Sequence, residues 1–194
     1  MSQALSTDVL IVGGGIANTF LKAQGYPIGK SLYEPHWVEK AKELLKKAER
    51  KGIVFPLPKD VVVAPAMDRP EEANLKPVDK VGDDDIIFDV GSETQKCYDQ
   101  LLKKAKKIIW NGPIGVFEVD AFSQGTRAIA QAIANSDAKS IAGGGDTIAA
   151  LNQFGLFDNI SYVSTGGGAF LEYVEGREFP IIDILADKFY RGIS

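Results

Sequence analysis

The sequence is poor in the residues that build disulfides and metal clusters. Its 194 residues include one cysteine, Cys97, and one histidine, His36. A single thiol cannot form an internal disulfide or a cysteine-rich zinc site, so we expect a reducing, cytoplasmic location. His36 lies beside Trp37 with no acid or nucleophile next to it in the sequence. We therefore assign it no catalytic role.

Long apolar runs and an excess of positive charge are also lacking. No stretch approaches the roughly 20 apolar residues of a membrane helix, and Met1–Asp8 lacks the pattern of a signal peptide. Lys and Arg number 22 against 26 Asp and Glu, which gives a net charge of −4. These absences argue against a membrane partner and a nucleic-acid partner. The 45% hydrophobic share instead predicts a soluble globular domain.

Runs of β-branched residues alternate with helical patterns, as in a parallel sheet covered by helices. Strands are predicted at Val9–Val12, Val61–Ala64, Ile86–Val90, Ile108–Trp110, Ser140–Ala142 and Tyr162–Ser164. Helices are predicted at Pro35–Lys51, from Ser92 onward, at Ser123–Asn135, at Thr147–Phe154 and at Gly168–Val174. The spacing of Ser92 and Gln95 is that of a capping box. The segment Ala66–Asp85 is predicted to be an exposed excursion with a solvated charge cluster at Asp83–Asp85. The predicted fold class is therefore α/β.

Glycine is the residue in excess, and it is concentrated where predicted strands end. The glycine-rich turns are Gly13–Gly15, Asn111–Pro113, Gly143–Thr147 and Ser164–Gly168. In an open α/β sheet, ligands bind beyond the carboxyl ends of the strands. Glycine lets the backbone approach a phosphate and point N–H groups at it from a helix start. Each turn alone could be an ordinary helix cap, but four together predict an anionic, phosphorylated ligand.

Three polar residues in or just after these turns separate the possible functions. Asp146, between three glycines and a helix start, could hold Mg2+ beside a nucleotide phosphate, or it could serve as an N-cap. Asn111 could donate its amide to a phosphate or be a turn residue. Asn18 occupies the third glycine position of the dinucleotide fingerprint, which makes a dinucleotide oxidoreductase the lesser hypothesis. No glycine cluster matches the P-loop pattern.

From about Asp8 to Pro180 the chain resembles the C-terminal, nucleotide-binding half of phosphoglycerate kinases. Five motifs occur in family order: LIVGGGIANTFL at 10–21, GKSL at 29–32, WNGPIGVFE at 110–118, GGGDT at 143–147 and STGGGA at 164–169. The resemblance implies a Rossmann-like, three-layer α/β/α fold with a mainly parallel sheet. It also implies that residues 1–194 form a single nucleotide-binding domain.

The resemblance assigns a role to each motif residue. The adenine slot would be walled by Gly13, Gly14, Gly15, Leu32, Pro113 and Val116. Glu118 would hold the ribose hydroxyls. The nucleotide phosphates would be met by Asn111, Gly143, Gly144, Gly145 and Thr147. Asp146 would bind Mg2+ together with ADP or ATP, and Gly166, Gly167 and Gly168 would stabilise the phosphoryl group during transfer.

The reaction implied by the family is the glycolytic, reversible phosphoryl transfer between 1,3-bisphosphoglycerate and MgADP, which gives 3-phosphoglycerate and MgATP. The family's N-terminal half, which binds the phosphoglycerate, has no counterpart here, and neither has the domain's first interior strand with its Gly-Gly-x-Lys-Val turn. We therefore expect a domain that carries most of the nucleotide site and does not catalyse transfer alone. The alternative is a non-catalytic nucleotide-binding or assembly module that self-associates through the gap left by this strand.

Overall fold

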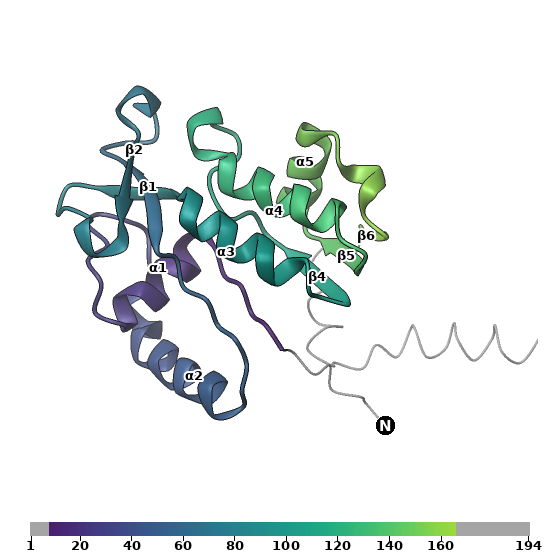
Figure 1. Cartoon of the computed structure of the whole chain (residues 1–194). Helices are drawn as coiled ribbons and strands as arrows, with labels where there is room; N and C mark the ends of the chain where they lie inside the picture. Colours follow the sequence, from purple (N-terminus) through teal and green to yellow (C-terminus); the bar gives the residue numbers. More distant parts are fainter. Residues whose placement is uncertain (1–7, 166–194) are drawn as a thin grey trace, which may run out of the picture.

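The computed structural model describes residues 8–165, and their strands form two three-stranded sheets (Figure 1). The antiparallel sheet has the order β2-β1-β3, with β1 at Asp60–Ala64, β2 at Asn74–Pro77 and β3 at Ile86–Val90. The parallel sheet has the order β4-β5-β6, with β4 at Lys107–Asn111, β5 at Lys139–Gly143 and β6 at Tyr162–Ser164. Strands and helices alternate from β3 to β6, which confirms the predicted α/β class.

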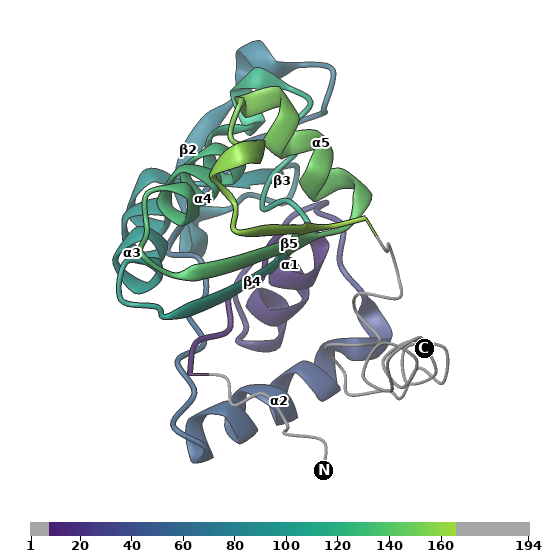
Figure 2. The ribbon, with the colours of Figure 1, turned by 90° about the vertical axis from the view of Figure 1, so that its right-hand side faces the viewer.

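Three helices cover one face of the parallel sheet. They are α3 at Ser92–Leu102, α4 at Gln124–Ala134 and α5 at Gly145–Phe154, and Figure 2 shows them on the same side of β4 and β5. The largest apolar cluster lies between these layers and includes Tyr98, Trp110, Ile129 and Leu151. Side chains along β4 alternate between the two faces of the sheet. Ile108 and Trp110 are buried on the face covered by the helices, whereas Ile109 is exposed on the other face.

Two further helices pack beside the antiparallel sheet. In α1, at Gly14–Ala23, Leu21 joins Val61 and Val63 of β1 in a second apolar cluster. On the other side of α1, Phe20 packs with Ala41 of α2, which spans Val38–Arg50. In both views α2 lies far from α4 and α5 (Figures 1 and 2). Of the helices in residues 8–165, none is long and apolar enough to cross a membrane.

Two strand expectations differ from the structure. The predicted strand Val9–Val12 is wrong over most of its length, because its only ladder contact within residues 8–165 is a parallel bridge between Val9 and Val54. Two hydrogen bonds around Val54 are too few to continue into the ladder that defines a strand. The excursion Ala66–Asp85 contains an edge strand, β2, whose four residues show no apolar alternation that a sequence pattern could detect.

The start of α3 is capped by Asp60 of β1, whereas the sequence predicted a cap by Ser92. Ser92 makes no capping hydrogen bond. Instead, the buried carboxylate of Asp60 in β1 accepts hydrogen bonds from the backbone N–H of Glu93 at 3.0 Å and of Thr94 at 2.8 Å. The Thr94 hydroxyl donates to the same carboxylate at 2.6 Å. The capping box is therefore wrong, because a carboxylate distant in sequence satisfies these donors.

Asp89 of β3 is the second buried carboxylate that receives backbone N–H groups, and only 2% of the residue is exposed. It accepts hydrogen bonds from Val90 at 2.8 Å and from Gly125 of α4 at 2.7 Å. Burial raises the pKa of Asp89 from 3.8 to about 7, although the N–H groups of Gly125, Val90 and Gln124 act in the opposite direction. Its charge therefore changes near neutral pH.

We expect Asp60→Asn to lower the free energy of unfolding by about 1–3 kcal/mol, because an amide nitrogen would face a buried donor. Ser92→Ala is the matched control and should stay within about 0.5 kcal/mol of the parent chain. Urea unfolding followed by circular dichroism measures both. An equal loss in the two variants would contradict the assignment of the cap to Asp60.

The raised pKa of Asp89 predicts a pH dependence of stability. The folded chain holds this proton more tightly than the unfolded chain, so the contribution is complete below about pH 4 and is lost as the pH rises through about 7. The melting temperature of the parent chain should therefore fall relative to that of Asp89→Asn between about pH 4.5 and 8. A gap between the two proteins that stays constant over this range would refute the prediction.

Candidate functional site

The first glycine turn is packed directly against the loop that follows β4. A Cβ added to Gly13 would lie 2.7 Å from Cα of Ile114, so no side chain fits there. The N–H of Gly14, whose φ is +53°, donates to the carbonyl of Ile114 at 3.0 Å. This backbone contact brings Gly13–Gly15 beside the loop that contains Pro113, as the site prediction requires.

Leu32 lies against the same turn. Its Cδ2 atom is 3.4 Å from the position of a Cβ at Gly15, and Leu32 is 75% exposed. The amide of Asn18, one turn along α1, donates to the carbonyl of Leu32 at 3.0 Å. In the sequence pattern, Asn18 only disfavours a dinucleotide-binding fold. The structure gives it a positive role, which is to hold one expected wall residue beside another.

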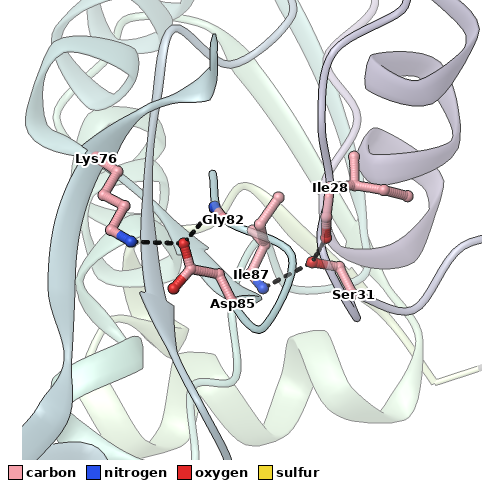
Figure 3. A network of polar contacts seen from close by, with 6 residues as sticks. All are labelled: Ile28, Ser31, Lys76, Gly82, Asp85 and Ile87. Carbon is pink, nitrogen blue, oxygen red and sulfur yellow. Dashed lines mark hydrogen bonds and ion pairs between the residues drawn. The ribbon is translucent and has the colours of Figure 1, made fainter. Parts of the chain in front are cut away.

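A polar network fixes the backbone just before Leu32 (Figure 3). The Ser31 hydroxyl donates to the carbonyl of Ile28 and accepts a hydrogen bond from the N–H of Ile87 at 2.8 Å. The N–H of Lys30 donates to the carbonyl of Asp85 at 2.8 Å. A Cβ at Gly29, whose φ is +54°, would overlap that carbonyl oxygen. The motif at 29–32 is thus a docking segment for the chain before β3.

The Asp85 carboxylate holds the other side of this network together. It accepts a hydrogen bond from the Gly82 N–H at 2.6 Å and pairs with Lys76 of β2, also at 2.6 Å (Figure 3). The acidic run at 83–85 was expected to be a solvated charge cluster. For Asp85 that expectation is wrong, because its side chain is only 18% exposed and bridges two segments.

The strand register brings the expected phosphate residues together at one edge. Asn111, Gly143 and Ser164 are the last residues of the three parallel strands and are aligned with one another. The hydroxyl of Thr147, in the first turn of α5, accepts a hydrogen bond from the Gly112 N–H at 2.7 Å. A Cβ at Gly144 would lie 2.4 Å from Oδ1 of Asn111. The turns after β4 and β5 therefore form one structure.

The loop after β4 is held from three sides. The hydroxyl of Thr126 in α4 accepts hydrogen bonds from the N–H groups of Ile114 and Gly115, both at 3.1 Å. The N–H of Val116 donates to the carbonyl of Phe88, next to Asp89 in β3, at 3.0 Å. Gln153 of α5 donates to the carbonyl of Phe117 at 3.0 Å.

The remaining predicted residues lie around this loop or outside the described chain. Pro113 and Val116 are half-buried, whereas Glu118 is exposed. Asp146 is exposed in the first turn of α5, beside the glycines at 144 and 145. Gly166, Gly167 and Gly168 lie outside residues 8–165. Within those residues, no three side chains of His, Cys, Asp or Glu come together as a metal cluster.

A hollow of about 570 Å³ lies away from all of these residues. It is bordered by α1 and α2, with Ala23, Leu45 and Phe55 in its lining. None of the residues predicted to bind nucleotide or metal lines it. The candidate site is therefore the edge formed by the glycine turns, where the backbone groups converge.

Known proteins match this chain in sequence and in structure. The chain matches the family model described as Phosphoglycerate kinase over residues 2–177. It is 57% identical to phosphoglycerate kinase of Coxiella burnetii over 181 residues, which cover 93% of this chain and 46% of that protein. It is 53% identical to the enzyme of Francisella tularensis over 184 residues, with 95% and 47% covered. The chain thus spans about half the length of these curated relatives.

Solved structures match as well. The structure of phosphoglycerate kinase from Coxiella burnetii aligns with a TM-score of 0.88 over 93% of this chain and 46% of that one. The enzyme of Pyrococcus horikoshii OT3, at 32% identity, aligns with a TM-score of 0.78 over 92% of this chain and 45% of that one. The chain therefore matches phosphoglycerate kinases in both sequence and fold over nearly its whole length. This protein belongs to the phosphoglycerate kinase family.

Proposed function

We propose that this chain is the C-terminal, nucleotide-binding half of a phosphoglycerate kinase and that it binds ADP and ATP with Mg2+. The single observation that carries the proposal is the joint structure of the turns after β4 and β5, in which Asn111, Gly144 and Thr147 meet. These turns lie at the carboxyl ends of parallel strands and at the start of α5. That is where backbone N–H groups and the helix dipole favour a phosphate.

The adenine and ribose ends of the nucleotide have matching surfaces nearby. Leu32 and Gly15 are in contact, and Gly13 touches the loop that carries Pro113. An exposed leucine beside glycine backbone offers an apolar surface to a purine ring. Glu118, exposed on the same loop, would accept hydrogen bonds from the ribose hydroxyls, since a carboxylate is an acceptor-only group.

Asp146 supports a divalent cation on electrostatic grounds. An exposed carboxylate in the first turn of α5 would repel a phosphate bound at the same turn unless a cation neutralised both. Within residues 8–165 it has no cluster of further ligands. Mg2+ is commonly bound by one or two carboxylates plus substrate phosphates and water. The ion would supply charge neutralisation for the phosphate oxygens.

In the complete reaction this half would position the nucleotide, and Gly166, Gly167 and Gly168 would stabilise the phosphoryl group in transfer. Such a transfer depends on in-line positioning and on charge stabilisation. The phosphoglycerate would be bound by the half of the relatives that this chain does not match. We therefore expect no turnover by this chain alone in a coupled assay with 3-phosphoglycerate and MgATP.

A second candidate function is assembly with a further copy of the chain. Ile109, Ile141 and Tyr162 are aligned across the parallel sheet, and Ile109 and Tyr162 are 42% and 63% exposed. Both faces of a parallel sheet are normally covered. Sedimentation of the parent chain and of Ile109→Lys tests this candidate, which predicts a dimer that the lysine dissociates.

We expect Asp146→Ala to weaken MgADP binding by about tenfold or more, because a charge-assisted contact is removed. Isothermal titration calorimetry measures the dissociation constant. Asp137→Ala is the control, since this exposed carboxylate precedes β5 at the opposite end of the strand. When Mg2+ is chelated, the parent chain and Asp146→Ala should bind ADP with similar affinity. Equal MgADP affinities for both variants and the parent chain would contradict the role of Asp146.

Gly144→Ala tests the joint turn directly. The φ of Gly144 is +93°, and an added Cβ would push Asn111 away, so we expect weaker MgADP binding together with lower stability. Gly155→Ala is the matched control at the other end of α5. Its φ is +66°, but an added Cβ meets nothing within 4 Å. It should lower stability by about 1 kcal/mol and leave the affinity for MgADP unchanged.

A further inference from the structure

We propose that Asp89 is a positioning residue for the nucleotide, which holds the loop 111–118 in its binding conformation by joining β3 to the start of α4. The proposal rests on the proposed function, because that loop carries the residues expected at the adenine, the ribose and one phosphate. Asp89 itself is buried, so it would act through the loop and not by contact with the nucleotide.

The first step is the contact between Asp89 and α4. One carboxylate oxygen accepts the N–H of Gly125 at 2.7 Å, and the other accepts the N–H of Val90 at 2.8 Å. Gly125 is the second residue of α4, where backbone N–H groups have no partner within the helix. Asp89 therefore fixes the first turn of α4 relative to β3.

The second step runs from α4 to the loop. Thr126 follows Gly125 directly and is fully buried, with its hydroxyl 3.1 Å from the N–H groups of both Ile114 and Gly115. Since Gly125 and Thr126 are neighbours in one helical turn, a shift of the Gly125 backbone displaces the Thr126 hydroxyl from both donors. The loop would then lose two of its backbone anchors.

The third step is direct contact between Asp89 and the loop. A Cβ added to Gly115 would lie 2.2 Å from Oδ1 of Asp89, and a Cβ added to Gly125 would lie at the same distance. Both glycines therefore leave room for this carboxylate. Val116, next in the loop, donates to the carbonyl of Phe88, the residue before Asp89. Two contacts thus join the end of β3 directly to the loop.

The test must separate two roles of Asp89: general stabilisation of the fold and positioning of the loop 111–118. Asp60 provides the comparison, because it is also buried, lies in the same sheet and receives the first N–H groups of a helix, α3. Among residues 8–165, the hydrogen bonds of its carboxylate reach only α3, so its loss should affect folding and not the loop. The pair Asp89→Asn and Asp60→Asn thus separates positioning from general stabilisation.

The experiment compares the parent chain, Asp89→Asn and Asp60→Asn at pH 8 and at a temperature where all three are folded by circular dichroism. MgADP is titrated by calorimetry, and hydrogen exchange is followed at the amides of Ile114, Gly115 and Val116. We expect Asp89→Asn to weaken MgADP binding about tenfold and to speed exchange at these amides. We expect Asp60→Asn to change neither. Thr126→Val should reproduce the Asp89→Asn result, because it removes the acceptor for the same two donors.

Two outcomes would overturn the proposal. One is unchanged affinity and unchanged exchange in Asp89→Asn. The other is an equal change in Asp60→Asn, which would assign the effect to lower stability. If the parent chain binds no MgADP, the proposed function fails, and the exchange rates alone then decide whether Asp89 positions the loop.

Discussion

The parallel, in-register pairing of β4 with β5 is the constraint on which the candidate site depends. It aligns Asn111 with Gly143. The next residue after β4, Gly112, then bonds Thr147, and the next residue after β5, Gly144, lies against Asn111. A shift by one residue would turn Asn111 to the opposite face of the sheet. Ile108 and Trp110 fix the register from the other side, because both must point into the core beneath α3 and α4.

Buried carboxylates connect the antiparallel sheet to the helices that cover the parallel sheet. Asp60 and Asp89 lie on neighbouring antiparallel strands, and each receives backbone N–H groups from the start of a different helix. Each contact satisfies donors that a helix start leaves unpaired. In the case of Asp89 the same contact lies next to the loop after β4. Asp89 therefore contributes both to the packing of α4 and to the shape of the candidate site.

Local patterns predicted most elements, and they did so for a physical reason. The alternation around Ile108 and Trp110, the amphipathic pattern of α2 and the Gly52 that follows its end with a φ of +69° are all short-range signals. These local patterns failed where an element depends on hydrogen-bonding partners that are distant in sequence. Val9–Val12 has the composition of a strand but forms only one ladder bridge within residues 8–165. In contrast, β2 is paired although its residues show no apolar alternation. The cap of α3 comes from Asp60, which lies more than 30 residues before it.

The sequence by itself determined the α/β class, the glycine turns at strand ends, the resemblance to the family and the set of residues expected at the nucleotide. Only the tertiary structure decided how these residues are held. Asn18 holds Leu32, Asp85 secures the network before it, and Asp89 and Thr126 fix the loop after β4. The contacts that Asn18, Thr126 and Asp89 make with other elements join residues that are 11 to 36 positions apart in the chain. They depend on the packing of several elements at once, so no local pattern of residues encodes them.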